Sequence, residues 1–325
     1  MDMMKKISVV IPTYKRPQLL IKCLHALHQQ VLEKKYYEVI VVSDGFDAAT
    51  KKLVHEMQHL FQDHLVYLHH EVRKGPAAAR NLGWLFSSSP LIAFTDDDCI
   101  PDERWLLEIL THHDGKSDLV YSGTVIVPTA RKPTDYEKNT AQLEQAEFIT
   151  ANCACTKKVL YQVGGFDERY KMAWREDSDL HFKLLQQRIP IIKLPKAVVI
   201  HPVRRAKWGV SVKEQKKGIY NALLFKKFPT LYRSKIASRT SLLYYTLLVL
   251  LLIMIYSTIV RMPLLQWYST IFWVCLTMAF IMLRLRGTRR SLGHVTEIVV
   301  TSIVIPYLSI FWKIYGAIKF RVFMI

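Results

Sequence analysis

The stretch "LIAFTDDDCIPDERW", residues 91–105, decides how the first part of the chain folds. A short apolar run, Leu91–Phe94, is followed almost at once by three consecutive carboxylates, Asp96, Asp97 and Asp98. Apolar runs of this length bounded by polar residues are typical of buried strands. Like charges a few ångströms apart repel by up to about 4 kcal/mol at a surface-like dielectric. The stretch therefore predicts a buried strand that ends at a site for a cationic group.

Three more buried strands are expected before this one, alternating with helical patterns. The strands are expected at 7–12, 37–45 and 64–70, and the helices at 18–31, 48–61 and 75–86. This alternation predicts an α/β fold with a largely parallel sheet covered on both faces. Ligands bind beyond the carboxyl ends of the strands in such sheets. We therefore expect the strand-end segments "PTYKR", "SDG" and "TDDDC" to meet at one edge.

The triple aspartate predicts a divalent metal site. Residues two apart in extended backbone point the same way, so Asp96 and Asp98 can face one ion while Asp97 turns elsewhere. A few hard oxygen ligands with open positions suit Mg²⁺ or Mn²⁺ shared with a substrate diphosphate. Neither GxxxxGK[ST] nor GxGxxG occurs in the sequence, which argues against a P-loop nucleotidase and a dinucleotide enzyme.

The charge distribution separates a soluble part from a membrane part. Residues 1–200 hold 26 Lys/Arg and 25 Asp/Glu, whereas residues 201–325 hold 19 Lys/Arg and only Glu214 and Glu297. The second part contains apolar runs at 240–260 and 263–283, each close to the roughly 20 residues that cross a bilayer. We expect domain boundaries at 1–203, 204–239 and 240–325.

A third apolar run, 295–312, is interrupted by Glu297 and Pro306. The N-terminus does not have a signal-peptide pattern, and segments 203–240 and 284–290 are basic, so the positive-inside rule predicts a multi-pass membrane protein with a cytoplasmic catalytic domain. If the third run also spans, Lys313, Lys319 and Arg321 are left outside. A re-entrant or interfacial helix is the alternative for this run.

The basic segment 204–239 has the pattern of an amphipathic juxtamembrane helix. Its apolar side is formed at helical spacing by Trp208, Val212, Ile219, Leu223 and Leu224. Lysines surround that side, so we expect the segment to lie in the headgroup layer before the first span. The alternative is a solvated helix packed on the catalytic domain.

Six motifs together resemble family 2 glycosyltransferases, which have the GT-A fold, a Rossmann-like, mostly parallel sheet that binds nucleotide-diphospho-sugars. They are "SVVIPTYKRP", "VVSDG", "KGPAAARNLG", "FTDDDC", "VGGFDE" and "REDSDL", in the family's order over about residues 5–205. The resemblance implies transfer of a sugar from a nucleotide-diphosphate donor with inversion at the anomeric carbon.

The resemblance also implies roles for individual residues. Pro12, Thr13, Tyr14 and Arg16 would line the nucleotide pocket, Asp44 would contact the base, Arg80 would lie near the diphosphate and Asp97 near ribose or donor sugar. Asp96 and Asp98 form the DxD pair, and His201 is a candidate third metal ligand. Asp177 matches the catalytic base, with Glu176 beside it. Asn152 and Trp174 would shape the acceptor side.

Several readings of the function stay open at this level. The leading one is a Mn²⁺- or Mg²⁺-dependent single transfer to a membrane-associated acceptor, either polyprenyl-linked or a polysaccharide. A processive polysaccharide synthase is less well supported, because "RRAKW" (204–208) reproduces its QxxRW motif only loosely. A membrane-anchored binding protein without turnover is another alternative. Nucleic-acid binding is not expected, because the basic residues cluster beside the apolar runs.

Overall fold

The computed structural model describes residues 6–115, 118–236 and 242–323. The chain divides into two compact units. Residues 6–128 and 141–203 form the first, called here the catalytic unit, and residues 129–140 and 204–323 form the second, called the membrane unit. The first two residues of the expected span 240–260 and the last three of the basic segment 204–239 lie outside the described residues.

The catalytic unit is built on one mixed sheet with the strand order β3-β2-β1-β4-β7-β6-β8-β5. The first half is parallel and consists of β1 (Ile7–Thr13), β2 (Tyr37–Ser43), β3 (Leu65–His69) and β4 (Leu91–Phe94). The second half consists of β5 (Ile100–Pro101), β6 (Val120–Ile126), β7 (Cys153–Thr156) and β8 (Ile191–Ile200). Strand β7 is antiparallel to both β4 and β6. The expected α/β fold with a mostly parallel sheet is confirmed.

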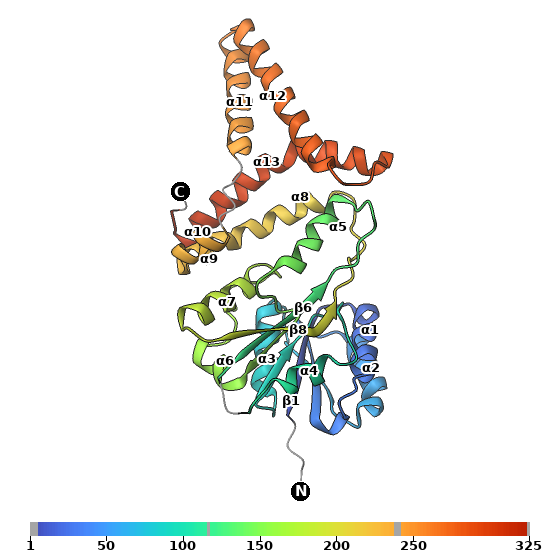
Figure 1. Cartoon of the computed structure of the whole chain (residues 1–325). Coiled ribbons are helices and arrows are strands. Elements are labelled where there is room, and N and C mark those ends of the chain that lie inside the picture. Colours follow the sequence, from blue (N-terminus) through green and yellow to red (C-terminus); the bar gives the residue numbers. More distant parts are fainter. Residues whose placement is uncertain (1–5, 116–117, 237–241, 324–325) are drawn as a thin grey trace. The chain divides into compact units, whose positions relative to one another are not determined.

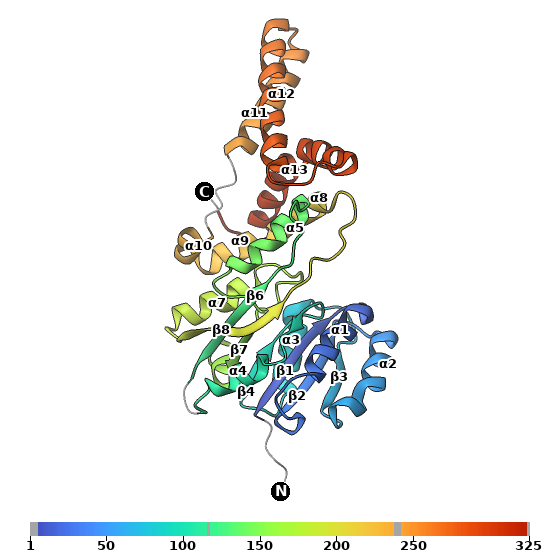
Figure 2. The ribbon, with the colours of Figure 1, turned by 45° about the vertical axis from the view of Figure 1, so that its right-hand side comes forward.

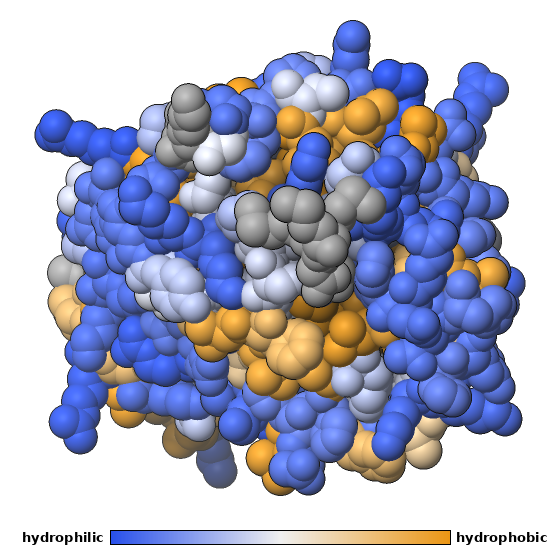
Figure 3. Space-filling view, turned by 90° about the horizontal axis from the view of Figure 1, so that it is seen from below, coloured by the Kyte–Doolittle hydropathy of each residue, from blue (hydrophilic) through white to orange (hydrophobic). Residues whose placement is uncertain are grey.

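Helices cover both faces of this sheet (Figure 1). They are α1 (Pro17–His28), α2 (Ala48–Met57), α3 (Pro76–Phe86), α4 (Trp105–Thr111), α6 (Lys157–Val163) and α7 (Glu176–Gln186). Alternate residues of β1 enter opposite layers of the core: Val9 and Ile11 pack in one apolar cluster and Val10 in the other. The face of this unit seen in Figure 3 is mostly hydrophilic, as expected of a water-exposed domain.

The parallel strands bring their carboxyl ends to one edge, as predicted. Residues 14–16 follow β1, residues 44–47 follow β2 and residues 95–99 follow β4. The end of β3 contributes a further segment, residues 70–75, which leads into α3. This edge holds most of the candidate nucleotide and metal residues.

The membrane unit begins with short helices and continues with three long apolar ones. The short helices are α5 (Asp135–Thr140), α8 (Val210–Glu214), η4 (Gln215–Gly218), α9 (Ile219–Lys227) and α10 (Pro229–Lys235). The long helices are α11 (Leu242–Ile259), α12 (Pro263–Leu285) and α13 (Leu292–Phe320), and all three are long and apolar enough to cross a membrane. Helices α11 and α12 form a hairpin, which is seen from two directions in Figures 1 and 2.

A buried arginine joins four segments of the membrane unit. The Arg284 guanidinium donates to Asp135 Oδ2 at 2.7 Å, to Thr301 Oγ1 at 2.8 Å, to Ser302 Oγ at 2.9 Å and to Ser211 Oγ at 3.2 Å. These partners lie on α5, α13 and α8. Segment 129–140, which the chain inserts between β6 and β7, is therefore fixed within the membrane unit by a charge pair and hydrogen bonds.

Candidate active site

Asp97 ties the end of β4 to the end of β1. Thr13 Oγ1 donates to Asp97 Oδ2 at 2.7 Å, and Arg16 Nη1 lies 3.1 Å from Asp97 Oδ1. Thr13 and Asp97 are buried, and Pro12 is buried beside them. Asp97 thus turns away from its two neighbours, as the strand geometry predicts, and it fixes the loop after β1 that is expected to line the nucleotide pocket.

The other two aspartates take part in a cluster of possible metal ligands. Side-chain atoms of Asp96, Asp98, Cys99 and His201 all lie within 4.8 Å of one another. His201 follows β8, and its Nε2 is 3.7 Å from Asp98 Oδ1. Among the described residues, the buried Nδ1 of His201 has no hydrogen-bond partner. Two carboxylates and an imidazole form a donor set that fits Mn²⁺ or Mg²⁺.

Cys99 is the weakest member of this cluster. Burial, together with the charges of Asp96 and Asp98, raises the pKa of its thiol well above the ordinary value. A protonated, buried thiol is a poor ligand for a hard cation. Asp96, Asp98 and His201 are therefore the residues best suited to hold a metal, which is the set expected from the sequence.

A buried arginine connects the metal cluster to Glu176, the residue before the expected base Asp177. Arg80 Nη2 lies 2.7 Å from Asp96 Oδ1, and Arg80 Nη1 lies 3.2 Å from Glu176 Oε1. The side chains of Arg80 and Glu176 are 3% and 4% exposed, so both charges depend on this pairing. Burial alone would lower the pKa of Arg80, but Asp96 and Glu176 outweigh it and keep the guanidinium charged. Sequence reasoning placed Arg80 near the diphosphate but did not predict this connection.

Glu176 and Asp177 open α7 side by side. Burial raises the pKa of Glu176 to about 7, against the opposing effect of Arg80. Burial also raises the pKa of Asp177, while the backbone amide of Ser178, which donates to Asp177 Oδ1 at 2.6 Å, acts in the other direction. A carboxylate with a raised pKa beside a charged network is suited to general-base chemistry near neutral pH.

The pocket expected to hold the nucleobase includes Arg73, which was not predicted from the sequence. The Arg73 guanidinium lies 4.2 Å from the centre of the Tyr14 ring, and its Nε is 3.5 Å from Asp44 Oδ2. Asp44 Oδ1 accepts hydrogen bonds from the backbone amides of Lys74 and Gly75 at 2.6 and 2.8 Å. A basic pair directly after the end of β3 was the available signal, because β3 ends at the same edge as β1 and β2.

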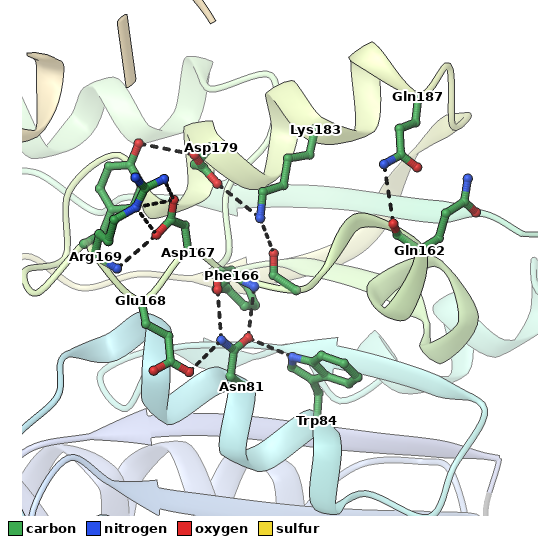
Figure 4. A network of polar contacts seen from close by, with 12 residues as sticks. Asn81, Trp84, Gln162, Phe166, Asp167, Glu168, Arg169, Asp179, Lys183 and Gln187 are labelled. Atoms are coloured by element: carbon green, nitrogen blue, oxygen red, sulfur yellow. Dashed lines mark hydrogen bonds and ion pairs between the residues drawn. The ribbon is translucent and has the colours of Figure 1, made fainter. Parts of the chain in front are cut away.

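A polar network holds the loop that precedes α7 (Figure 4). Asn81, next to Arg80 on α3, donates to the Phe166 carbonyl oxygen and to Glu168 Oε1, and its side-chain oxygen accepts from the Phe166 amide and the Trp84 indole. On α7, Lys183 donates to the Gly165 carbonyl oxygen at 2.8 Å. The loop is thus attached to α3 at one side and to α7 at the other, which fixes the start of α7, where Glu176 and Asp177 lie.

The two residues expected on the acceptor side, Asn152 and Trp174, differ in how far they are exposed to solvent. Asn152 is completely buried and uses its side chain internally: it accepts from the Trp105 indole and donates to the Thr124 and Ala197 carbonyl oxygens. It therefore ties β6 and β8 to α4, so any part it has in shaping the acceptor side is through the positions of these elements, and that role stays a prediction. Trp174 is 38% exposed, three residues before Asp177, and its acceptor role stays a prediction.

Arg80 provides a test of the buried charge network. We expect Arg80→Met to lower the free energy of unfolding by about 3–5 kcal/mol, because it leaves two carboxylates without their counter-charge. Adding Glu176→Gln should recover part of the loss. Arg104→Met is the control, since the Arg104–Glu108 pair is exposed at its arginine and such pairs contribute about 0–1 kcal/mol. Thermal and denaturant unfolding of the purified proteins measures the free energy of unfolding of each variant. If Arg80→Met and Arg104→Met lower it equally, the proposed role of the buried network is wrong.

Comparison with known proteins confirms the family resemblance. The family model "Glycosyl transferase family 2" matches residues 8–174. The chain is 38% identical over 100 residues to "Glycosyltransferase AglE" from Haloferax volcanii, covering 31% of this chain and 33% of that protein. It is 24% identical over 253 residues to a validoxylamine A glucosyltransferase from Streptomyces hygroscopicus, covering 65% and 52%. The chain thus spans about a third to a half of the length of these curated relatives.

Solved structures show the same fold. The mannosyltransferase PcManGT from Pyrobaculum calidifontis, in complex with GDP-Man and Mn²⁺, aligns with a TM-score of 0.56 at 15% identity, covering 97% of this chain and 87% of that one. S. aureus TarS in complex with UDP aligns with a TM-score of 0.51 at 19% identity, covering 73% of each chain. Because the family model matches more than half of this chain, the chain belongs to glycosyl transferase family 2.

Proposed function

We propose that this glycosyltransferase is metal-dependent and transfers one sugar, with inversion, from a nucleotide-diphosphate donor to a membrane-associated acceptor. The observation that carries the proposal is the continuous network from Asp98 and His201 through Asp96 and Arg80 to Glu176, beside Asp177. The network links the candidate metal ligands to Glu176, the residue before the candidate base, and this link supports the proposal. The relatives that bind UDP or GDP-Man support the donor class.

In the proposed reaction, Asp177 accepts the proton of the acceptor hydroxyl as that oxygen attacks the anomeric carbon. The bond between this carbon and the diphosphate oxygen breaks on the opposite side, so the configuration inverts. A divalent ion held by Asp96, Asp98 and His201 would supply positive charge to offset the charge of the departing diphosphate. Arg80 holds Asp96 and Glu176 in place. Glu176 supplies the negative charge that balances Arg80 beside the base.

The acceptor class follows from the membrane unit. Its apolar helices suggest a bilayer, and we infer that the acceptor hydroxyl belongs to a polyprenyl-linked sugar or a nascent polysaccharide at the membrane surface. The basic residues between the catalytic unit and α11 favour a cytoplasmic catalytic unit. Ile219, Leu223 and Leu224, expected to form a free apolar side of the basic segment, are buried.

A donor screen tests the reaction. The purified protein is incubated with UDP-, GDP- and dTDP-sugars and Mn²⁺, with and without lipid-linked acceptors, and the anomeric configuration of the product is read by NMR. We expect one nucleotide class to support transfer and the product to be inverted. A retained configuration, or transfer that proceeds equally well with the metal chelated, would contradict the proposed mechanism.

The raised pKa of Asp177 predicts the pH dependence. The base must be ionised, so kcat should fall as the pH is lowered through the pKa of Asp177; this fall is the acidic limb of the pH profile. Because burial raises this pKa, the limb should lie above about pH 3.9, the pKa of an ordinary aspartate. Arg175→Gln removes a nearby positive charge that lowers the pKa of Asp177 and should move the limb to higher pH. The pH profiles of kcat for the two proteins measure this, and a limb at the same pH in both would show that Arg175 and Asp177 are not coupled.

A further inference from the structure

Helix α13 is attached along most of its length to the basic helices that precede the membrane hairpin. Near its start, Glu297 Oε1 accepts a hydrogen bond from the Gly209 amide at 2.7 Å. At its end, Lys226 Nζ donates to the Phe320 carbonyl oxygen at 2.8 Å. Residues 297–320 of α13 and residues 209–226 of α8, η4 and α9 therefore run side by side in the same direction.

The two backbones touch in the second half of this contact. A Cβ atom at Gly316 would lie 2.7 Å from the carbonyl oxygen of Ile219 and 3.0 Å from its Cα atom, so α13 can approach α9 this closely only with glycine. Both Gly316 and Ile219 are buried. No bilayer lipid can lie between helices that are this close.

This packing conflicts with a transmembrane position for α13. The helices beside it carry the exposed lysines Lys213, Lys216 and Lys226. If α13 crossed the hydrocarbon layer, these helices would have to enter it too, and burying their charged lysines in hydrocarbon is unfavourable. Figures 1 and 2 show α13 crossing the end of the α11–α12 hairpin at a steep angle instead of continuing alongside it.

The side of α13 that faces away from α9 is apolar and exposed. Its exposed apolar residues recur at helical spacing and form one strip, called here the α13 strip: Val300, Ile303, Val304, Phe311, Ile314, Tyr315 and Ile318. Their exposed fractions range from 38% to 73%. The buried residues of the helix lie mostly on the other side, so one face packs on protein and the opposite face is available to a partner.

We infer that the α13 strip lies in the headgroup–acyl boundary of a bilayer, and that the chain crosses the membrane only twice, through α11 and α12. The basic segment 286–291 joins α12 to α13, and its three arginines suit a position at the headgroups. Lys319 and Arg321 at the end of α13, together with the lysines of η4 and α9, provide positive charge for anionic headgroups. This topology keeps Lys313, Lys319 and Arg321 on the side of the catalytic unit.

Single-cysteine labelling distinguishes two spans from three. With Cys275, the exposed native cysteine, replaced by serine, one reporter is introduced at a time: Val72→Cys in the catalytic unit, Met262→Cys in the turn between α11 and α12, or Phe323→Cys after α13. A membrane-impermeant maleimide is applied to right-side-out and inverted vesicles. We expect residues 72 and 323 to be labelled from one side and residue 262 from the other.

Labelling of residues 323 and 262 from the same side would overturn the inference. So would a cysteine at 323 that reacts in detergent but from neither side of the vesicles, because that places the end of α13 within the bilayer. None of these outcomes depends on which sugar or acceptor the enzyme uses.

A depth measurement tests the α13 strip itself. Fluorophores are attached to Val300→Cys or Phe311→Cys, which are about 16 Å apart along a helix, and quenched with lipids that carry nitroxides at shallow or deep positions. A helix in the boundary layer predicts shallow quenching at both sites. A spanning helix predicts deep quenching at both, because residues 300 and 311 lie within about 9 Å of the midpoint of α13, on opposite sides of it. Weak quenching at both sites, with disulfide-linked dimers of Phe311→Cys, would assign the strip to a second copy of the chain.

Discussion

Asp98→Asn is expected to lower kcat by about 10³-fold, because it removes a charged ligand from the candidate metal site while keeping the shape of the side chain. Metal ions contribute several kcal/mol to this kind of charge stabilisation, and each 1.36 kcal/mol changes the rate tenfold. Asp98 is 6% exposed and follows the carboxyl end of β4. A carboxylate from the protein surface therefore cannot reach the site and act as the missing ligand in the variant. Transfer rates and Mn²⁺ affinity, measured by electron paramagnetic resonance with nucleotide present, report the two effects.

Two further variants make this test specific. His201→Gln should also weaken Mn²⁺ binding if His201 is a ligand, and unchanged affinity would assign the metal to the aspartates alone. Glu103→Gln, an exposed acid five residues after Asp98, removes the same charge outside the site and should leave both readouts unchanged. If Asp98→Asn retains normal Mn²⁺ affinity, the proposed ligand role is wrong, whatever happens to the rate.

Asp177→Asn should reduce kcat by about 10²- to 10⁴-fold and leave donor affinity almost intact. An amide cannot accept the proton of the acceptor hydroxyl, but it preserves the size of the side chain and its position at the start of α7. Pre-steady-state transfer and calorimetric titration of the donor nucleotide separate the chemical step from binding. A loss of donor affinity with an unchanged kcat would make Asp177 a binding residue.

Ser178→Ala is the matched control for this position. It removes the hydroxyl that lies 3.4 Å from Asp177 Oδ1 but keeps the backbone amide at 2.6 Å, so the base stays in place. We expect an effect within about tenfold, the range of one modest hydrogen bond. An effect as large as that of Asp177→Asn would indicate that the position of the helix start, and not the carboxylate, controls the rate.

The strands of the parallel half-sheet could be predicted almost to the residue. The run 7–12 became β1 (Ile7–Thr13), and 91–95 became β4 (Leu91–Phe94), because continuous β-branched and aromatic runs between turn residues leave few alternatives. The topology rule for parallel sheets then placed Asp96, Asp98 and the loop after β1 at one edge. These parts of the site follow from local pattern and chain direction.

The position of Asn152 could not be predicted in the same way. The family resemblance implied a role on the acceptor side, but it did not indicate that Asn152 is buried with three hydrogen bonds to segments far apart in the sequence. The Arg73–Tyr14 stack and the Arg80–Glu176 pair are also contacts over long sequence separation. Such pairs depend on how the strands are ordered and how the loops close, and neither is encoded in a short window of residues.

The sequence by itself determined the α/β catalytic unit, the acidic strand end and the presence of three apolar helices, because these depend on local hydrophobic pattern and composition. Only the tertiary structure decided which segments each of those helices packs against. Helix α13 has the length and composition of a transmembrane helix, yet Gly316 lets it pack directly on α9. The transfer of the lysines of α9 into hydrocarbon is energetically unfavourable. An apolar helix can be surrounded by lipid or can pack on protein along one side. The segments that pack on it decide this, and they come from another part of the chain.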